Sequence, residues 1–214
     1  MSTDSTRAAT AGVETASPPV TPIGIDVGEK TLVAAATPDM DTRDVFTVEG
    51  HAPAQVFDYL TTAVGALQSA GFETEAGEAQ LTAAFWYRLR AQLLDTVART
   101  VEWVRTHPNP VLVLEDLGRH HRPLWEIRDD AEQVGAWLLP HLQIELADRA
   151  IDAGVPVVYV DPDGTSLECH RCGERGERKG KRLRCLNPDC GVGGVDADRS
   201  AAITIASRGE ERGL

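Results

Sequence analysis

The sequence of 214 residues predicts a mixed α/β fold built on one sheet, with a small metal-binding module inserted near the C-terminus. Two observations lead to this fold class. Short apolar runs at 23–27, 31–36, 111–114 and 155–160 alternate with long segments of helical periodicity. All four cysteines of the chain lie between residues 169 and 190, in two closely spaced pairs.

The N-terminal half predicts a tail, three strands and two helices. Residues 1–21 contain almost no large apolar side chain, so we expect a disordered tail. The runs 23–27 and 31–36 flank a short turn that contains Gly28, which predicts a hairpin, and 43–49 predicts a third strand. Helical patterns follow at 53–71 and 78–106, and residues 72–77 predict a polar connection between them.

The C-terminal half predicts the remaining strands. The continuous apolar run 111–114 is typical of a strand buried on both faces, and 155–160 predicts another. A helix is expected at about 129–153, and a short one from Asp196 to Ala206. We therefore expect one domain made of 22–164 and 192–208, interrupted by a module at 165–191.

Charge is unevenly distributed along the chain. The net charge of −12 argues against a generic nucleic-acid binder. Between 171 and 184, however, seven basic residues face two acidic ones. That segment either contacts a phosphate backbone or balances an acidic body. The candidate nucleic-acid contacts in it are Arg175, Arg178, Lys179, Lys181, Arg182 and Arg184.

Composition also bears on the environment of the protein. Three lysines stand against eighteen arginines, and an acidic, lysine-poor chain fits a salt-loving organism, whose proteins are acidic whatever they bind. No run of eighteen apolar residues and no secretory signal occurs in the sequence. We therefore expect a cytoplasmic protein that does not cross a membrane.

The two cysteine pairs predict a structural zinc site. Cys169 and Cys172 are separated by two residues and Cys185 and Cys190 by four, and a glycine follows each pair. Four thiolates on two tight turns suit the tetrahedral preference of Zn²⁺, which holds together a segment too small for its own core. Two disulfides or unrelated thiols are the alternative, which an intracellular location disfavours.

Three carboxylates stand in positions that suggest a second metal site. Asp26 interrupts an apolar strand, Glu115 ends a buried strand, and Asp198 begins the last helix. The ordinary alternatives are a solvent-facing Asp26 and a helix-capping role for Asp196 or Asp198. In a ribonuclease H-like layout the three positions meet at one sheet edge, where they can hold two Mg²⁺ ions about 4 Å apart.

Four motifs in order carry a family resemblance. They are Gly24-Ile25-Asp26-Val27-Gly28, Leu114-Glu115-Asp116-Leu117, Thr165-Ser166 before the first cysteine pair, and Asp196-Ala197-Asp198-Arg199-Ser200-Ala201-Ala202. With four cysteines between the last two carboxylates, residues 23–206 resemble the RuvC-type nuclease and zinc-ribbon half of the TnpB/OrfB family. These transposon-encoded, RNA-guided DNA nucleases are related to the compact type V CRISPR effectors.

The resemblance implies a ribonuclease H-like RuvC core with an inserted Cys₄ zinc ribbon. It implies Asp26, Glu115 and Asp198 as catalytic ligands of Mg²⁺ or Mn²⁺, with Asp196 as the fallback for the third. It implies Cys169, Cys172, Cys185 and Cys190 as zinc ligands. DNA is the implied partner, and a guide RNA is left open.

The sequence also departs from the family pattern. The recognition region that precedes the nuclease core in the family has no counterpart before residue 23, so we expect a partner protein or a missing module to supply it. Ser200 replaces the usual asparagine, and the second cysteine pair encloses four residues rather than two.

Three functions are therefore considered. The first is a Mg²⁺-dependent DNA endonuclease, and the second is an inactive remnant that binds DNA or RNA. The third is an actin-like or sugar-kinase-type ATPase, because Gly24 to Gly28 followed by Lys30 and Thr31 is similar to a phosphate loop. The second phosphate loop and the adenosine segment of those ATPases are not found in the sequence.

Overall fold

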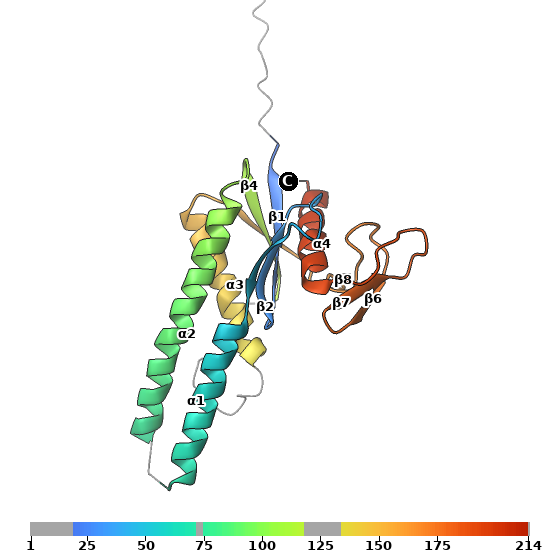
Figure 1. Ribbon diagram of the computed structural model, residues 1–214. Coiled ribbons are helices and arrows are strands. Elements are labelled where there is room, and N and C mark those ends of the chain that lie inside the picture. The colour runs from blue at the N-terminus through green and yellow to red at the C-terminus, as the bar shows by residue number, and fades with distance from the viewer. Residues whose placement is uncertain (1–18, 72–74, 118–133, 214) are drawn as a thin grey trace, which may run out of the picture.

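The structure, a computed structural model, describes residues 19–71, 75–117 and 134–213 (Figure 1). The tail expected at 1–21 therefore lies almost wholly outside the described residues, as does the expected start of the third helix. The main sheet contains β1 (Thr21–Val27), β2 (Thr31–Ala36), β3 (Phe46–Glu49), β4 (Pro110–Glu115) and β5 (Val157–Val160). The helices are α1 (His51–Ser69), α2 (Glu75–Val104), α3 (Val134–Asp152) and α4 (Ala197–Glu211).

The five strands lie in the order β3-β2-β1-β4-β5. β1 pairs antiparallel with β2, which pairs antiparallel with β3, whereas β1 and β5 flank β4 in parallel. The prediction of a mixed α/β fold is confirmed. Residues 75–77, expected in a connection, instead begin α2, so residues 70–74 separate the two helices. Glu75 and Ala76 are good helix formers, which accounts for the difference.

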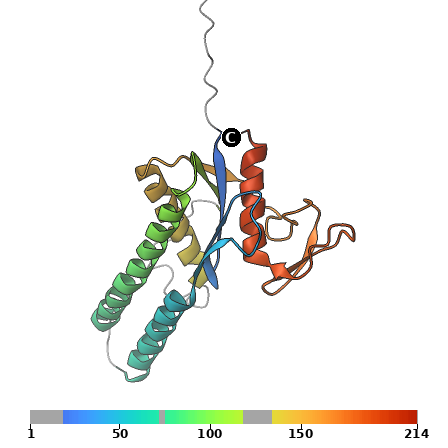
Figure 2. The same cartoon turned by 45° about the horizontal axis from the view of Figure 1, so that its top comes forward.

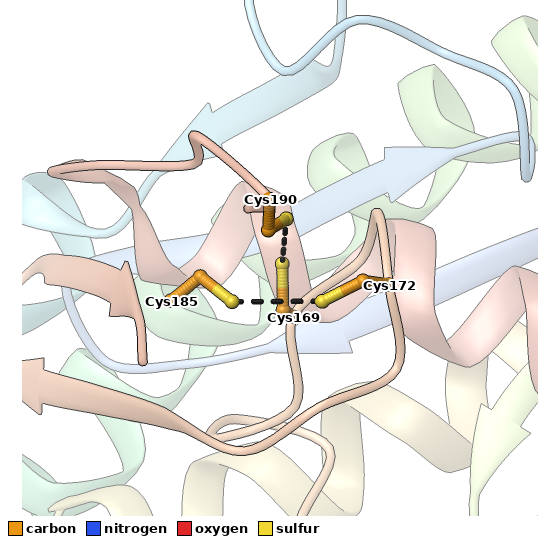
Figure 3. Close-up of side chains that lie close together, drawn as sticks. All are labelled: Cys169, Cys172, Cys185 and Cys190. Carbon is orange, nitrogen blue, oxygen red and sulfur yellow. Dashed lines mark hydrogen bonds between the residues drawn. The ribbon is translucent and has the colours of Figure 1, made fainter. Parts of the chain in front are cut away.

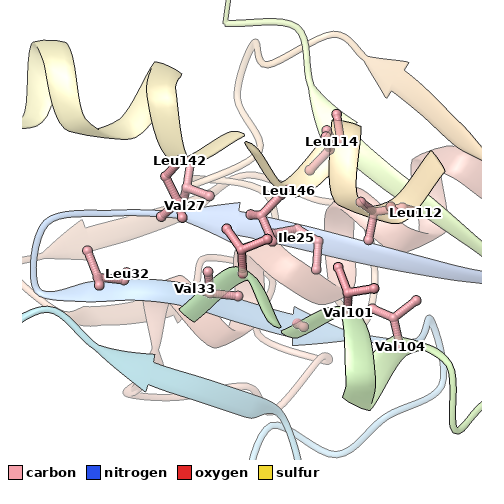
Figure 4. Close-up of a cluster of buried hydrophobic side chains, with 14 of the residues drawn as sticks. Ile25, Val27, Leu32, Val33, Val101, Val104, Leu112, Leu114, Leu142 and Leu146 are labelled. Atoms are coloured by element: carbon pink, nitrogen blue, oxygen red, sulfur yellow. The ribbon is translucent and has the colours of Figure 1, made fainter. Parts of the chain in front are cut away.

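Side chains of β1 alternate between the two faces of the sheet, as strand geometry requires. Ile23, Ile25 and Val27 pack in the main core with buried residues of α2 and α3 (Figure 4). Leu112 and Leu114 of β4 point to the same side. Gly24 and Val113 belong to the opposite face, which α4 covers. Odd positions of β1 and even positions of β4 thus serve one core, and the others face α4.

The contact between α4 and β1 is unusually close. A Cβ added at Gly24 would lie 2.9 Å from the Cα of Ala206 and closer still to other backbone atoms of α4. Ala202 and Ile203 of α4 pack against Ala34 and Ala36 of β2, and Ile205 packs against Val113. Small residues on both elements therefore allow the helix to lie directly on the strand.

A second sheet forms the cysteine-containing module. It contains β6 (Gly176–Lys179), β7 (Arg182–Cys185) and β8 (Val195–Asp196), in that order and antiparallel throughout. β8 runs directly into α4, and the amide of Ala197 donates to the carbonyl oxygen of Lys181 at 2.9 Å. The module is thereby fixed to the first turn of α4, beside the sheet (Figure 1).

α1 and α2 form a helical hairpin whose far end extends beyond the sheet, as Figures 1 and 2 show. No described side chain of α1 is fully buried, and the fully buried residues described in α2 begin at Leu89. The part of α2 from Leu89 to Val104 packs in the main core beside the sheet. Trp103 of this part stacks on Phe46, with ring centroids 5.2 Å apart. In the described part of the chain, no helix has the length and hydrophobicity needed to span a membrane.

Candidate active site and zinc site

The strand alternation brings two of the predicted carboxylates together. Ile25 of β1 pairs with Leu114 of β4 in parallel, so Asp26 and Glu115 are the next residues along adjacent strands. Both belong to the face covered by α4, because Asp26 follows Gly24 at a spacing of two and Glu115 follows Val113 likewise. Asp198, in the first turn of α4, comes to the same place.

The two acidic residues at the start of α4 have different contacts. Asp196 is the N-cap, and its Oδ1 accepts hydrogen bonds from the amides of Asp198 and Arg199, both at 3.1 Å. Asp198 is buried and acts electrostatically on Asp26 more strongly than Asp196 does. The capping alternative thus describes Asp196, while Asp198 lies near enough to Asp26 for its charge to act on it.

The crowding of negative charge is visible in the pKa values. Burial, together with the Glu115 and Asp198 carboxylates, raises the pKa of Asp26 well above its usual value, and Arg178 opposes this effect. Burial also raises the pKa of Glu115, against a hydrogen bond from Thr165. Oxygen ligands with like charges in one place suit a divalent cation such as Mg²⁺, which would offset their repulsion. The residues present therefore fit the expected cation.

Two residues that the sequence did not single out as site residues hold Glu115 in place. Thr165 donates from Oγ1 to Oε1 of Glu115 at 2.5 Å, and Gln143 of α3 donates from Nε2 to its backbone oxygen at 2.6 Å. Thr165 and Gln143 are both buried. A polar Gln143 beside the buried Leu142 was a visible irregularity in the helical pattern, but its partner depends on tertiary structure.

Three basic residues of the β6–β7 hairpin have hydrogen-bond partners within the protein, although Arg178 and Arg182 are also exposed. Arg178 donates from a terminal guanidinium nitrogen to Oδ1 of Asp198 at 2.9 Å. Lys181 lies 3.3 Å from the hydroxyl of Thr31, and Arg182 donates to the carbonyl oxygen of Gly194. The side chains of Arg175, Lys179 and Arg184 are exposed. The hairpin thus lies beside the carboxylates and also offers free cationic groups.

The four cysteines converge as predicted (Figure 3). Their sulfur atoms all lie within 4.8 Å of one another, with Cys169 to Cys190 at 3.6 Å and Cys172 to Cys185 at 3.5 Å. Tetrahedral ligands with Zn–S bonds of about 2.3 Å place sulfurs about 3.8 Å apart. All four are free thiols, so the disulfide alternative does not describe this structure. The four cysteines could hold one zinc ion.

The local backbone explains the two cysteine turns. Gly173 and Gly191 have φ angles of 72°, in the left-handed region that favours glycine. Backbone N–H groups of Glu174, Asn187 and Val192 point to the sulfurs two residues earlier, at Cys172, Cys185 and Cys190. Burial raises the pKa of the Cys185 thiol to about 12. A bound metal would favour its deprotonated form.

His170, between the first two cysteines, is not part of this group. Its Nδ1 lies 2.8 Å from the Ser200 hydroxyl of α4, which links the ribbon to the helix that carries Asp198. Among the described residues, the cysteines are the one set of three or more potential ligands whose atoms all lie within 4.8 Å. The three carboxylates are therefore more widely spaced, with Arg178 bound to one of them.

Comparison with known proteins now adds to this geometry. A family model described as "Cas12f1-like, TNB domain" matches residues 141–205. The CRISPR-associated endodeoxyribonuclease Cas12f2 of Micrarchaeota archaeon (strain CG1_02_47_40) is 41% identical over 66 residues, which cover 28% of this chain and 12% of the relative. This segment is similar to the corresponding part of Cas12f proteins.

Solved structures extend the similarity to the whole fold. A cryo-EM structure of a Cas12f1–sgRNA–target DNA complex matches 87% of this chain with a TM-score of 0.67 and 15% identity. A CRISPR-Cas12f ternary complex matches 92% with the same TM-score and 16% identity. The chain covers 49% and 40% of those two proteins, which is less than half of either. The expected relation to compact type V effectors is confirmed, and the narrower assignment to TnpB stays a prediction.

Proposed function

We propose that the chain is the nuclease and zinc-ribbon part of an RNA-guided, divalent-metal-dependent DNA endonuclease of the TnpB/Cas12 kind. The observation that carries the proposal is the convergence of Asp26, Glu115 and Asp198 on the face of the sheet that α4 covers. The relatives support it, since one is named an endodeoxyribonuclease and two others were solved with nucleic acid.

In this proposal the three carboxylates hold Mg²⁺ or Mn²⁺. Two such cations, when bound, stabilise the attacking and leaving oxygens of a phosphodiester, so that hydrolysis leaves a 3′-hydroxyl and a 5′-phosphate. Thr165 and Gln143 fix the position of Glu115 through its side chain and its backbone. The zinc-held ribbon positions the basic hairpin, whose exposed Arg175, Lys179 and Arg184 bind the phosphate backbone.

Targeting requires more than this chain's described parts supply. The matched relatives are about twice as long or longer, so guide RNA and target recognition are assigned to regions or partners outside the described core. We propose DNA as the substrate and a guide RNA as the partner that selects it. The core itself retains the capacity to cut single-stranded or unwound DNA.

The test is cleavage of end-labelled single-stranded DNA by zinc-loaded protein with Mg²⁺ or Mn²⁺, at low and at multimolar salt. Asp26→Ala removes one of the three carboxylates and should abolish cleavage. Glu29→Gln is the matched control, because Glu29 is an exposed carboxylate in the β1–β2 turn, and it should cleave like the wild type. A folded, zinc-loaded protein that cuts nothing under these conditions would support the inactive-remnant alternative.

A further inference from the structure

The inference concerns Arg178, one of the predicted nucleic-acid contacts, whose side chain also reaches the carboxylate of Asp198. Its guanidinium is 2.9 Å from Oδ1 of Asp198, and the two side chains are 33% and 11% exposed. Its Nε also donates to the carbonyl oxygen of Gly180 at 3.1 Å, which folds the side chain back over the hairpin. Arg178 therefore has a defined position at the carboxylates rather than a free one in solvent.

This position conflicts with occupation of the site by a cation. The guanidinium takes one acceptor position on Oδ1 of Asp198 and partly neutralises the carboxylate, so fewer positions and less negative charge are left for a metal ion. The charge of Arg178 also acts on Asp26. A positive charge so near repels an incoming cation in a partly buried site, where screening is weak. Ion pairing and repulsion thus both oppose cation binding.

The proposed substrate supplies a reason for Arg178 to leave. Lys179 and Arg184 project from the opposite face of the β6–β7 hairpin, because side chains alternate along a strand, so their contacts leave Arg178 free to move. A phosphodiester bound at the carboxylates, as the proposed function requires, would instead lie directly beside the guanidinium of Arg178. Phosphate is a strong partner for a guanidinium, since it accepts two parallel hydrogen bonds.

We propose that Arg178 is an internal counter-ion that occupies Asp198 in the absence of nucleic acid, and that DNA phosphate withdraws it and thereby raises the affinity of the carboxylates for a divalent cation. This inference rests on the proposed function. It makes cation loading conditional on substrate, so the free protein holds its cation weakly. Arg178 is a positioning residue in this scheme, because it acts through Asp198.

The first experiment measures Mn²⁺ binding to zinc-loaded protein by the electron paramagnetic resonance signal of free Mn²⁺. Arg178→Gln should lower the Kd for Mn²⁺ by about tenfold, the ratio that corresponds to one partly buried ion pair. Arg90→Gln removes the same charge from an exposed position of α2 and should stay within about twofold of wild type. Arg178→Lys keeps the charge and should bind more weakly than Arg178→Gln.

A second experiment repeats the measurement with a phosphorothioate single-stranded DNA that resists cleavage. Mn²⁺ bound by the DNA alone is measured separately and subtracted. The strand should lower the Kd of the wild type toward that of Arg178→Gln and leave Arg178→Gln almost unchanged. Equal Mn²⁺ affinity in wild type and Arg178→Gln, or an equal response to the strand, overturns the inference and leaves the proposed function standing. Mn²⁺ binding that persists unchanged in Asp198→Asn, or that is absent both from Arg178→Gln and from the wild type with the strand, overturns both.

Discussion

Replacing Gly24 with alanine tests whether the close contact between β1 and α4 holds the candidate active site together. The added Cβ would lie 2.9 Å from the Cα of Ala206 and nearer to two other backbone atoms of α4, where ordinary contact begins at 3.4 Å. Backbone cannot rotate away as a side chain can, so α4 would have to move by about 1 Å. Overpacking of this kind costs about 3 kcal/mol of unfolding free energy.

For a chain of this size that loss lowers the melting temperature by about 6–12 °C. Thermal unfolding followed by circular dichroism, with zinc present, measures it. Gly65→Ala is the matched control: a Cβ there meets nothing within 4 Å, and the exchange lies inside α1, so it should raise stability by about 0.5–1 kcal/mol. Because α4 carries Asp198, Gly24→Ala should also weaken Mn²⁺ binding without touching a ligand. An unchanged melting temperature in Gly24→Ala would refute the packing argument.

Two further predictions concern the two candidate metal sites. Because the pKa of Asp26 is raised in the folded protein, its contribution to stability is complete below the unfolded value of 3.8 and is lost as pH rises through the folded value. Asp26→Asn should therefore raise the melting temperature at pH 7.5 without Mg²⁺ or Mn²⁺, by about 2–4 °C, and a lower melting temperature would contradict the assignment. At the ribbon, the pKa of Cys185 is raised to about 12, so zinc must displace its proton and zinc affinity should fall as pH falls. Competition with a chromogenic chelator between pH 6 and 8 measures this, and the same affinity at both ends would refute it.

Much of the fold was open to prediction from the sequence. The short apolar runs of β1 and β2, the first of them alternating with Gly24 and Asp26, and the continuous apolar run of β4 indicated their strands, because hydrophobic pattern and strand burial are directly linked. The same alternation explains why Asp26 and Glu115 share a face. The cysteine spacing predicted the convergence of four sulfurs for a similar reason, since each pair lies on one short turn.

The contacts around the carboxylates were harder to predict from the sequence. Thr165 is fifty residues from Glu115 and Gln143 is twenty-eight from it, so neither contact leaves a local pattern in the sequence. Arg178 was recognised as basic and placed on a hairpin, yet its direction depends on how β8 joins the ribbon to α4. Residue type predicted the charge, and only the tertiary arrangement decided which partner the charge meets.

The helical hairpin of α1 and α2 has a consequence for how the molecule can change. It leaves the sheet after β3 and returns at β4, so both of its ends are anchored while its far end is held by neither the sheet nor the ribbon. Inserting one matched turn into each helix would lengthen this arm by about 5.4 Å and preserve the register of every strand. The reach of the arm can thus vary, in evolution or by engineering, without any adjustment at the candidate active site.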